Sequence, residues 1–361
     1  MWIEYHERLE TEQPGEAAMI DEIVASMGRL QRQVFDQHRH ALRDAHAKVH
    51  GVLKGRLVVD DSLPAELAQG IFQPGREYPV VARLSSSPGE IHPDEIRSLK
   101  GLALKVIGVE GARLRPETDN EVTQDFLLVN LPVLPFGDVK AYLGRQKSQE
   151  SAAQEKATPD TLIPSLAGRA AEALSDAGLP NRTLEAMGPS AHHILGETFH
   201  SMAAIRFGRY VAKLSMAPLS ESVTLLTGQP VDASTKDSVY RDLVLEFFHN
   251  QSATYTVRAQ MCTDLARMPI EDASVEWPSE ISSHLRLGTI EFPSQHSYSP
   301  ARRVYVDEIL SFNPWQGLAA HRPLGSIMRS RIKAYEASTQ FRHTQNARTR
   351  AEPRAISDIP D

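Results

Sequence analysis

The stretch VHGVLKGRLVV at residues 49–59 decides the fold class. It is short, rich in β-branched residues and interrupted by glycine, and these features predict a β-strand. Similar stretches follow at 78–86, 100–109 and 125–130, with turn-forming residues and no helical pattern between them. Strands at such short intervals predict an antiparallel sheet or barrel.

The pattern changes outside this block of strands, where helix formers or apolar residues at helical spacing alternate with further strand-like stretches. The segments expected are helices at 17–43, 139–157, 165–178, 238–250 and 326–339, and strands at 209–216, 253–261 and 285–292. We therefore expect one α+β domain, with an N-terminal helical arm at 1–35 and a core at 36–345. The tail at 346–361 is polar and contains proline, and it is expected to be disordered.

Composition limits the classes of function. The net charge of −7 gives no reason to expect nucleic acid or an anionic membrane as a partner. The one cysteine, Cys262, excludes an internal disulfide and fits a reducing compartment. No apolar run approaches the roughly 18 residues of a spanning helix, and the N-terminus lacks the apolar segment of a signal peptide. We expect a soluble, cytoplasmic protein.

Two arginines raise questions of chemistry. Arg331 and Tyr335 lie four residues apart in a predicted helix and share one face, either as a packing pair or as a tyrosine metal ligand beside a cation. Arg83 and Ser85 share one face of the strand at 78–86. If that face is interior, the arginine needs an anion, whereas an exposed face needs none.

Two Glu-x-x-His segments offer a different kind of metal site. Glu197 with His200, and Glu246 with His249, have the spacing found in di-iron helical bundles. A strand-rich stretch separates the two segments, so packed or capping histidines are the simpler interpretation.

Five segments, taken in order, resemble the haem catalase superfamily. RDAHAKVHG at 43–51 is similar to the catalase segment that carries the distal histidine, ARLSS at 82–86 to the strand that follows it, and LKGLALKV at 99–106 to the next strand. VEWP at 275–278 is similar to a Val-Trp-Pro turn, and RIKAYEASTQFR at 331–342 resembles the proximal Arg-x-x-x-Tyr helix. The short chain looks like the compact catalase-related peroxidases, which have the core domain only.

This resemblance implies a catalase-like, eight-stranded antiparallel β-barrel with flanking helices and a buried haem b. It implies that Tyr335 is the iron ligand and Arg331 its partner. It also implies that His46 is the distal acid–base residue and that Ser85 orients it. Three arginines would then meet the haem propionates: Arg43, Arg83 and Arg342.

These residue types suit that chemistry. Ionising a phenol at pH 7 costs about 4 kcal/mol, and ferric iron and an adjacent cation both lower this cost. An imidazole can take a proton from bound peroxide and return it to the leaving oxygen, because its pKa lies near the working pH. We therefore expect a haem-dependent peroxidase or catalase-like oxidoreductase that cleaves hydrogen peroxide or organic hydroperoxides through a ferryl haem. A second peroxide or an organic electron donor would reduce the ferryl haem.

The sequence departs from the large catalases at two distal positions. Thr123 stands where they have an asparagine, with Asn120 as the alternative if the alignment shifts, and Ala45 precedes His46 where a valine is usual. A missing asparagine removes a hydrogen-bond donor near bound peroxide. We therefore expect weaker disproportionation and a preference for peroxidase chemistry.

Two other functions stay open from the sequence. The same haem residues would suit an enzyme that rearranges fatty-acid hydroperoxides, as allene oxide synthases do, or a haem-binding protein without turnover. The sequence also leaves the oligomeric state open, a homodimer or another homo-oligomer included.

Overall fold

The structure is a computed structural model that describes residues 1–154 and 191–361. The helix expected at 165–178, and the last residues of the one expected at 139–157, lie outside the described residues. Among the described residues, no helix combines the length and apolar character that a membrane crossing requires.

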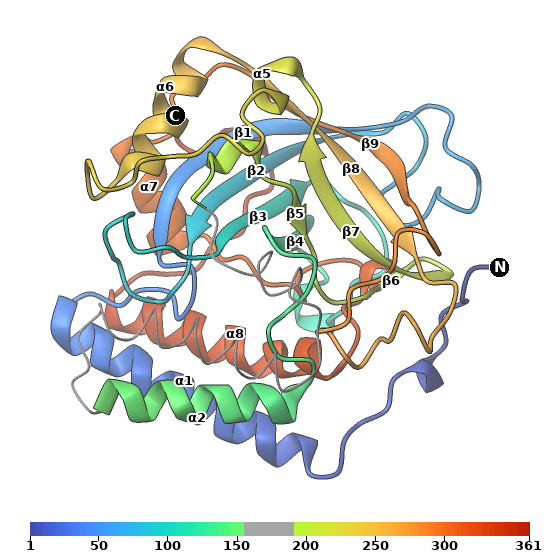
Figure 1. Ribbon diagram of the computed structural model, residues 1–361, viewed down its shortest axis with the longest axis horizontal. Helices are drawn as coiled ribbons and strands as arrows, with labels where there is room; N and C mark the ends of the chain where they lie inside the picture. The colour runs from blue at the N-terminus through green and yellow to red at the C-terminus, as the bar shows by residue number, and fades with distance from the viewer. Residues whose placement is uncertain (155–190) are drawn as a thin grey trace.

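A closed antiparallel barrel forms the centre of the molecule (Figure 1). The strands in the described residues are β1 Lys48–Val59, β2 Glu77–Ser86, β3 Lys100–Ile107, β4 Thr123–Val129, β5 Phe199–His200, β6 Ile205–Phe207, β7 Tyr210–Pro218, β8 Ala253–Met261 and β9 His284–Phe292. Eight of these described strands close in the order β5-β4-β3-β2-β1-β9-β8-β7, because β5 pairs with both β4 and β7. The short strand β6 pairs with a separate part of β7. The predicted eight-stranded barrel is confirmed.

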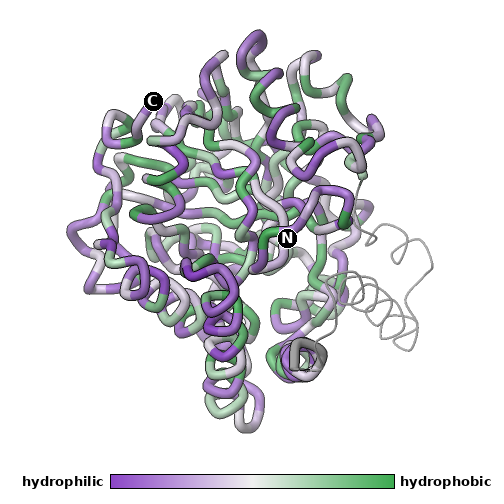
Figure 2. Tube along the Cα trace, turned by 90° about the vertical axis from the view of Figure 1, so that its left-hand side faces the viewer, coloured by the Kyte–Doolittle hydropathy of each residue, from purple (hydrophilic) through white to green (hydrophobic). Residues whose placement is uncertain are grey.

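Alternation along the strands divides the barrel wall into two faces. On β2, Val80, Ala82 and Leu84 point into the barrel and join its large apolar core. Arg83 and Ser85 lie on the outer face, as the period of two requires. Figure 2 shows the resulting mixture of hydrophobic and hydrophilic residues in the wall, with hydrophilic residues along the outer loops. The outer face is the one that carries the candidate site.

Helices flank the barrel (Figure 1). The α-helices described are α1 Glu16–His38, α2 Val139–Gln154, α5 Glu221–Thr224, α6 Val239–Asn250, α7 Pro300–Val304 and α8 Ser326–Gln345, and Tyr305–Ile309 forms a π-helical turn. Short 3₁₀ turns lie at Glu7–Leu9, Pro116–Thr118, Ile194–Gly196, Ala319–His321 and Ile356–Asp358. The first, second and last of the α-helices, α1, α2 and α8, pack against one another below the barrel.

Two expectations about the ends of the chain differ from the structure. The helix expected over 17–43 ends at His38, because Arg39 takes a left-handed conformation with φ 53°. The tail at 346–361 was expected to be disordered, but it lies against the barrel. Ile359 is 1% exposed within an apolar cluster, and the Arg302 guanidinium donates to the Pro360 carbonyl at 2.9 Å. One apolar residue and several backbone contacts therefore order a polar segment.

A buried ionic network also fixes this tail to the barrel. The Lys105 ammonium lies 2.6 Å from the Asp125 carboxylate and 2.7 Å from that of Glu352, and it is fully buried. The backbone N–H of Asn313 donates to the second oxygen of Asp125 at 2.9 Å, and burial raises the pKa of Asp125 to about 7. A residue of the tail therefore completes the coordination of a cation that belongs to β3.

Replacing Lys105 by methionine should destabilise the fold strongly. Two buried carboxylates would lose their shared cation, and breaking a buried pair in this way costs about 3–5 kcal/mol. The matched control is Lys236→Met, which removes the exposed pair with Asp242 and should cost under about 1 kcal/mol. Chemical denaturation of the two variants checks this, and equal losses would contradict the structural role of Lys105.

Candidate functional site

Arg331 and Tyr335 lie on one face of α8, as the sequence predicted. The guanidinium carbon of Arg331 is 5.9 Å from the centre of the Tyr335 ring. Burial raises the pKa of the Tyr335 phenol, the Arg331 charge opposes this rise, and the Asp44 carboxylate adds to it. A cation therefore lies against the phenol ring and favours its ionised form.

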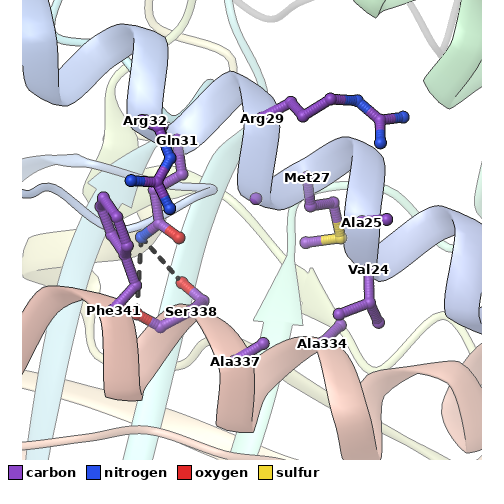
Figure 3. Close-up of a pocket in the computed structure, with 11 residues that line it drawn as sticks. Val24, Ala25, Met27, Arg29, Gln31, Arg32, Ala334, Ala337, Ser338 and Phe341 are labelled. Atoms are coloured by element: carbon purple, nitrogen blue, oxygen red, sulfur yellow. Dashed lines mark hydrogen bonds between the residues drawn. The ribbon is translucent and has the colours of Figure 1, made fainter.

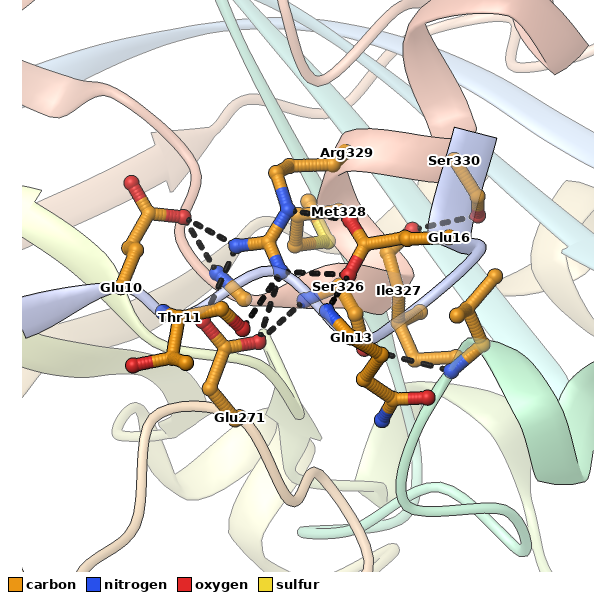
Figure 4. A network of polar contacts seen from close by, with 12 residues as sticks. Glu10, Thr11, Gln13, Glu16, Glu271, Ser326, Ile327, Met328, Arg329 and Ser330 are labelled. Atoms are coloured by element: carbon orange, nitrogen blue, oxygen red, sulfur yellow. Dashed lines mark hydrogen bonds and ion pairs between the residues drawn. The ribbon is translucent and has the colours of Figure 1, made fainter. Parts of the chain in front are cut away.

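The start of α8 is held by carboxylates from three other segments (Figure 4). The Arg329 guanidinium pairs with Glu10 at 2.9 Å, with Glu16 at 2.5 Å and with Glu271 at 2.9 Å. Glu271 also accepts from the backbone N–H of Ser326 at 2.8 Å. Helix N-terminal amides have no partner within the helix and favour negative charge. This network therefore fixes the helix that carries Tyr335.

His46 lies in the loop before β1 and has a positive φ of 54°. Its Nδ1 is 3.4 Å from the Ser85 hydroxyl on the outer face of β2. A side chain at Gly101 would come within 2.5 Å of that nitrogen, so the glycine makes room for the imidazole ring. Burial, together with the charges of Arg83 and Arg331, lowers the pKa of His46 to about 3. The imidazole is therefore neutral at pH 7.

His46 and Tyr335 also share an environment. The Arg331 charge acts on the pKa of both side chains. Each side chain keeps some accessible surface, although burial dominates its pKa. One cation therefore acts on both side chains, which come from the loop before β1 and from α8.

Three arginines gather on the same side of the barrel. Arg43 lies 3.0 Å from the Asp307 carboxylate and donates to the Val306 carbonyl at 2.7 Å. Arg83 lies 3.5 Å from Asp307 and donates to the His46 carbonyl at 2.9 Å. Arg342 donates to the backbone carbonyl of Asp307. The π-helical turn at Tyr305–Ile309 therefore gathers all three arginines around Asp307, two at its carboxylate and one at its backbone carbonyl.

This cluster carries more positive charge than its nearest carboxylate balances. Burial, and then the Arg43 charge, lowers the pKa of Arg83 to about 10 and that of Arg342 to about 9. Arg83 is 2% exposed, and its Nε has no hydrogen-bond partner among the described residues. The sequence left open whether the Arg83 face is interior or exposed. It is the outer face of the barrel, buried under other segments, and its charge suits a further anion.

Asp44 belongs to the same region, although the sequence analysis did not identify it. The Ser338 hydroxyl donates to its carboxylate at 2.5 Å, one turn after Tyr335 on α8. Burial raises the pKa of Asp44, while the charges of Arg331 and Arg43 oppose the rise. In the sequence, only its position between Arg43 and His46 could have identified Asp44 as a residue of the site. Ala45, next along the loop, is exposed.

Thr123 and Asn120, the two candidates for a distal hydrogen-bond donor, are not brought to His46. Gly101 contacts the His46 ring, whereas Thr123 pairs with Ile107, six residues further along β3 and about 20 Å away at roughly 3.4 Å per residue. The Thr123 hydroxyl accepts from the Gln316 amide at 3.2 Å, and Asn120 is exposed. The strand register therefore separates both residues from the imidazole.

The Glu-x-x-His segments lie on different elements. His200 is on β5, while Glu246 and His249 are on α6, where His249 is exposed. Within residues 1–154 and 191–361, no group of three or more His, Cys, Asp or Glu side chains is arranged to hold a metal ion. The two segments do not form the facing helices that a di-iron bundle needs.

Comparison with known proteins identifies the architecture. No protein-family model and no curated protein sequence matches this chain. Solved structures do match over 85% of the chain: a bacterial catalase at 16% identity and TM-score 0.59, a fungal catalase at 17% and 0.57, and catalase A from Saccharomyces cerevisiae at 16% and 0.57. The match covers 59%, 61% and 62% of those chains, respectively. The protein therefore has the catalase-like core fold and spans about three fifths of the length of these catalases.

Proposed function

We propose that this protein binds haem b and acts as a peroxidase or catalase-like oxidoreductase on hydrogen peroxide or organic hydroperoxides. One observation carries the proposal. Three arginines, of which Arg83 and Arg342 are buried and Arg43 is half-buried, are incompletely balanced by Asp307 and lie beside a tyrosine–arginine pair and a neutral histidine on the outer face of a catalase-like barrel. Fold alone does not assign a function, so the proposal rests on this combination of side chains.

The residues fit the parts of a haem. Its two propionates would bind Arg43, Arg83 and Arg342, and the unpartnered Nε of Arg83 offers a free donor to one of them. Tyr335 would be the iron ligand, and Arg331 would lower the cost of ionising the phenol. A tyrosine side chain holds the haem iron in catalase, so this residue type suits the role.

His46 would move the proton in the reaction. Bound haem would supply the electrons that break the O–O bond of the peroxide. Because the imidazole is neutral, it could accept a proton from one peroxide oxygen and give it to the other, which would leave as water or an alcohol. Ser85 would hold Nδ1 and so direct Nε2 toward the peroxide.

The absence of Thr123 and Asn120 from the His46 region supports a preference for organic donors. Gly101, which contacts the His46 ring, pairs with Val129 on β4. Val129 has no side-chain hydrogen-bond donor to offer near His46. We infer that disproportionation of hydrogen peroxide is weak and that peroxidase turnover dominates.

Titration of the purified protein with haemin tests the proposal. We expect one haem per chain with an absorption spectrum of tyrosinate-bound ferric iron. Oxygen release from hydrogen peroxide should then be slow relative to oxidation of a phenolic donor. A protein that takes up no haemin would refute the proposed function, and vigorous oxygen release without donor oxidation would refute the preference.

A further inference from the structure

A groove between α1 and α8 lies beside the Tyr335 region and has no role in the proposed function (Figure 3). Its cavity volume is about 290 Å³, near the lower limit of small-molecule sites. Met27 and Gly28 of α1 line one side of it, and Ala337 and Phe341 of α8 line the other. The space suits a molecule with one aromatic ring and a short side chain.

The charges at the groove favour an anionic ligand. Arg29 is already paired with Glu150 and Glu22. Arg32 lies 5.6 Å from the centre of the Phe341 ring and makes no ion pair within the described residues. An aromatic carboxylate could place its ring against the apolar wall and its charge beside Arg32.

The groove is close to Tyr335 in two ways. Ala334 lines the groove and directly precedes Tyr335, so the two point about 100° apart around a helix that is about 10 Å wide. Met27 also lines the groove, and the Tyr142 hydroxyl donates to its sulfur at 3.7 Å. Burial raises the pKa of Tyr142, and the Tyr335 charge contributes to this rise. Met27 and Tyr142 therefore place two oxidisable side chains at the groove, in the same region as the candidate iron ligand.

A path for a proton leaves the same groove. Ser338 lines it, accepts from the Gln31 amide at 3.2 Å, and donates to the buried Asp44 carboxylate at 2.5 Å. A phenol whose hydroxyl reaches Ser338 could pass its proton to Asp44 while its electron moves toward Tyr335. Gln31 and Asp44 hold the serine hydroxyl in the orientation that this transfer needs.

We propose that the α1–α8 groove binds the electron donor of the peroxidase reaction, and that this donor is a phenol bearing a carboxylate. The inference rests on the proposed function. Two phenols each lose one electron and one proton, and one hydroperoxide is reduced to an alcohol and water: ROOH + 2 ArOH → ROH + H₂O + 2 ArO•. The carboxylate stays unchanged beside Arg32.

Filling the groove tests the proposal. A Cβ at Gly28 meets no atom within 4 Å, so Gly28→Leu can enter the groove without a backbone clash. Gly144→Leu on α2 is the matched control, because its Cβ is equally unobstructed and Gly144 does not line the groove. Calorimetric titration with 3-(4-hydroxyphenyl)propionate should show binding to the wild type and to Gly144→Leu, and at least tenfold weaker binding to Gly28→Leu. Peroxide-dependent oxidation of this phenol, measured per bound haem, should fall at least tenfold in Gly28→Leu only.

Charge selection gives a second test. Arg32→Gln should weaken binding of the acid about tenfold and change binding of neutral 4-ethylphenol less than twofold. Equal binding or oxidation by Gly28→Leu and Gly144→Leu overturns the proposal, as does a wild type that does not bind the acid. Binding without oxidation, in a chain that holds haem and consumes peroxide, overturns the donor role alone. A chain that takes up no haem refutes the proposed function instead, and the donor role with it.

Discussion

Tyr335→Phe should remove the axial bond to haem iron, with a complete change in the absorption spectrum of the haemin-loaded protein. The phenylalanine keeps the ring that contacts Arg331 but lacks the oxygen that would bind iron. Burial opposes ionisation of this phenol, so iron coordination must supply most of the cost of about 4 kcal/mol. We expect haemin to bind weakly or with another axial ligand. Absorption spectra during haemin titration measure both effects.

The chain provides a matched control for this change. Tyr210 also follows an arginine, Arg206, by four residues, but it lies at the start of β7 and packs edge-on against Trp2 at 5.4 Å. Tyr210→Phe should leave the haem spectrum unchanged. If the axial bond survives in Tyr335→Phe, or disappears in Tyr210→Phe, the assignment of Tyr335 as the iron ligand is wrong.

His46→Gln should leave haem binding intact and lower the rate of reaction with peroxide roughly a hundredfold to ten-thousandfold. Glutamine can still form hydrogen bonds, but it cannot accept a proton and return it at neutral pH. The change should appear in the first step after mixing with peroxide, which stopped-flow absorption resolves. His249→Gln is the control, because His249 is an exposed histidine on α6. It should react as the wild type does.

The His46 variant also separates the alternative functions. A wild type that does not react with peroxide would favour a haem-binding protein without turnover, whereas an unchanged reaction in the variant would contradict the role of His46. Rearrangement of a fatty-acid hydroperoxide in the absence of any reductant would favour an allene oxide synthase-like enzyme. The proposed peroxidase needs the donor for continued turnover.

Local sequence patterns predicted seven of the eight strands that close the barrel in the described residues, namely β1 to β4 and β7 to β9. The β-branched, glycine-punctuated stretch at 49–59 lies within β1, and the alternating stretch at 253–261 coincides with β8. The same patterns could not predict strand β5, because a strand of two residues is too short to show an alternation of apolar and polar side chains. The tail was missed because its order depends on contacts such as that of Glu352 with Lys105, which are distant in the sequence.

The site could be predicted only where one segment contains the relevant residues. Arg331 and Tyr335 share a helix face, so their spacing places them together. The position of Thr123 depends on the register between β3 and β4, which no local pattern records. Asp307 was missed for a similar reason. Its carboxylate meets Arg43 and Arg83 only when the π-helical turn folds onto the outer face of the barrel.

The pairing of β1 with β9 has a consequence for biosynthesis. Arg56 on β1 pairs with Glu291 on β9, so one edge of β1 stays unpaired during translation until β9 has been synthesised. At about 5–20 residues per second, this delay is roughly 10 to 50 s. During that time the nascent chain exposes the unpaired edge of β1, which could pair with another chain. Because α8 is made later still, uptake of the proposed haem should follow synthesis of almost the whole chain. Chaperone binding during the delay should increase the yield of folded protein, and slower translation should lower it.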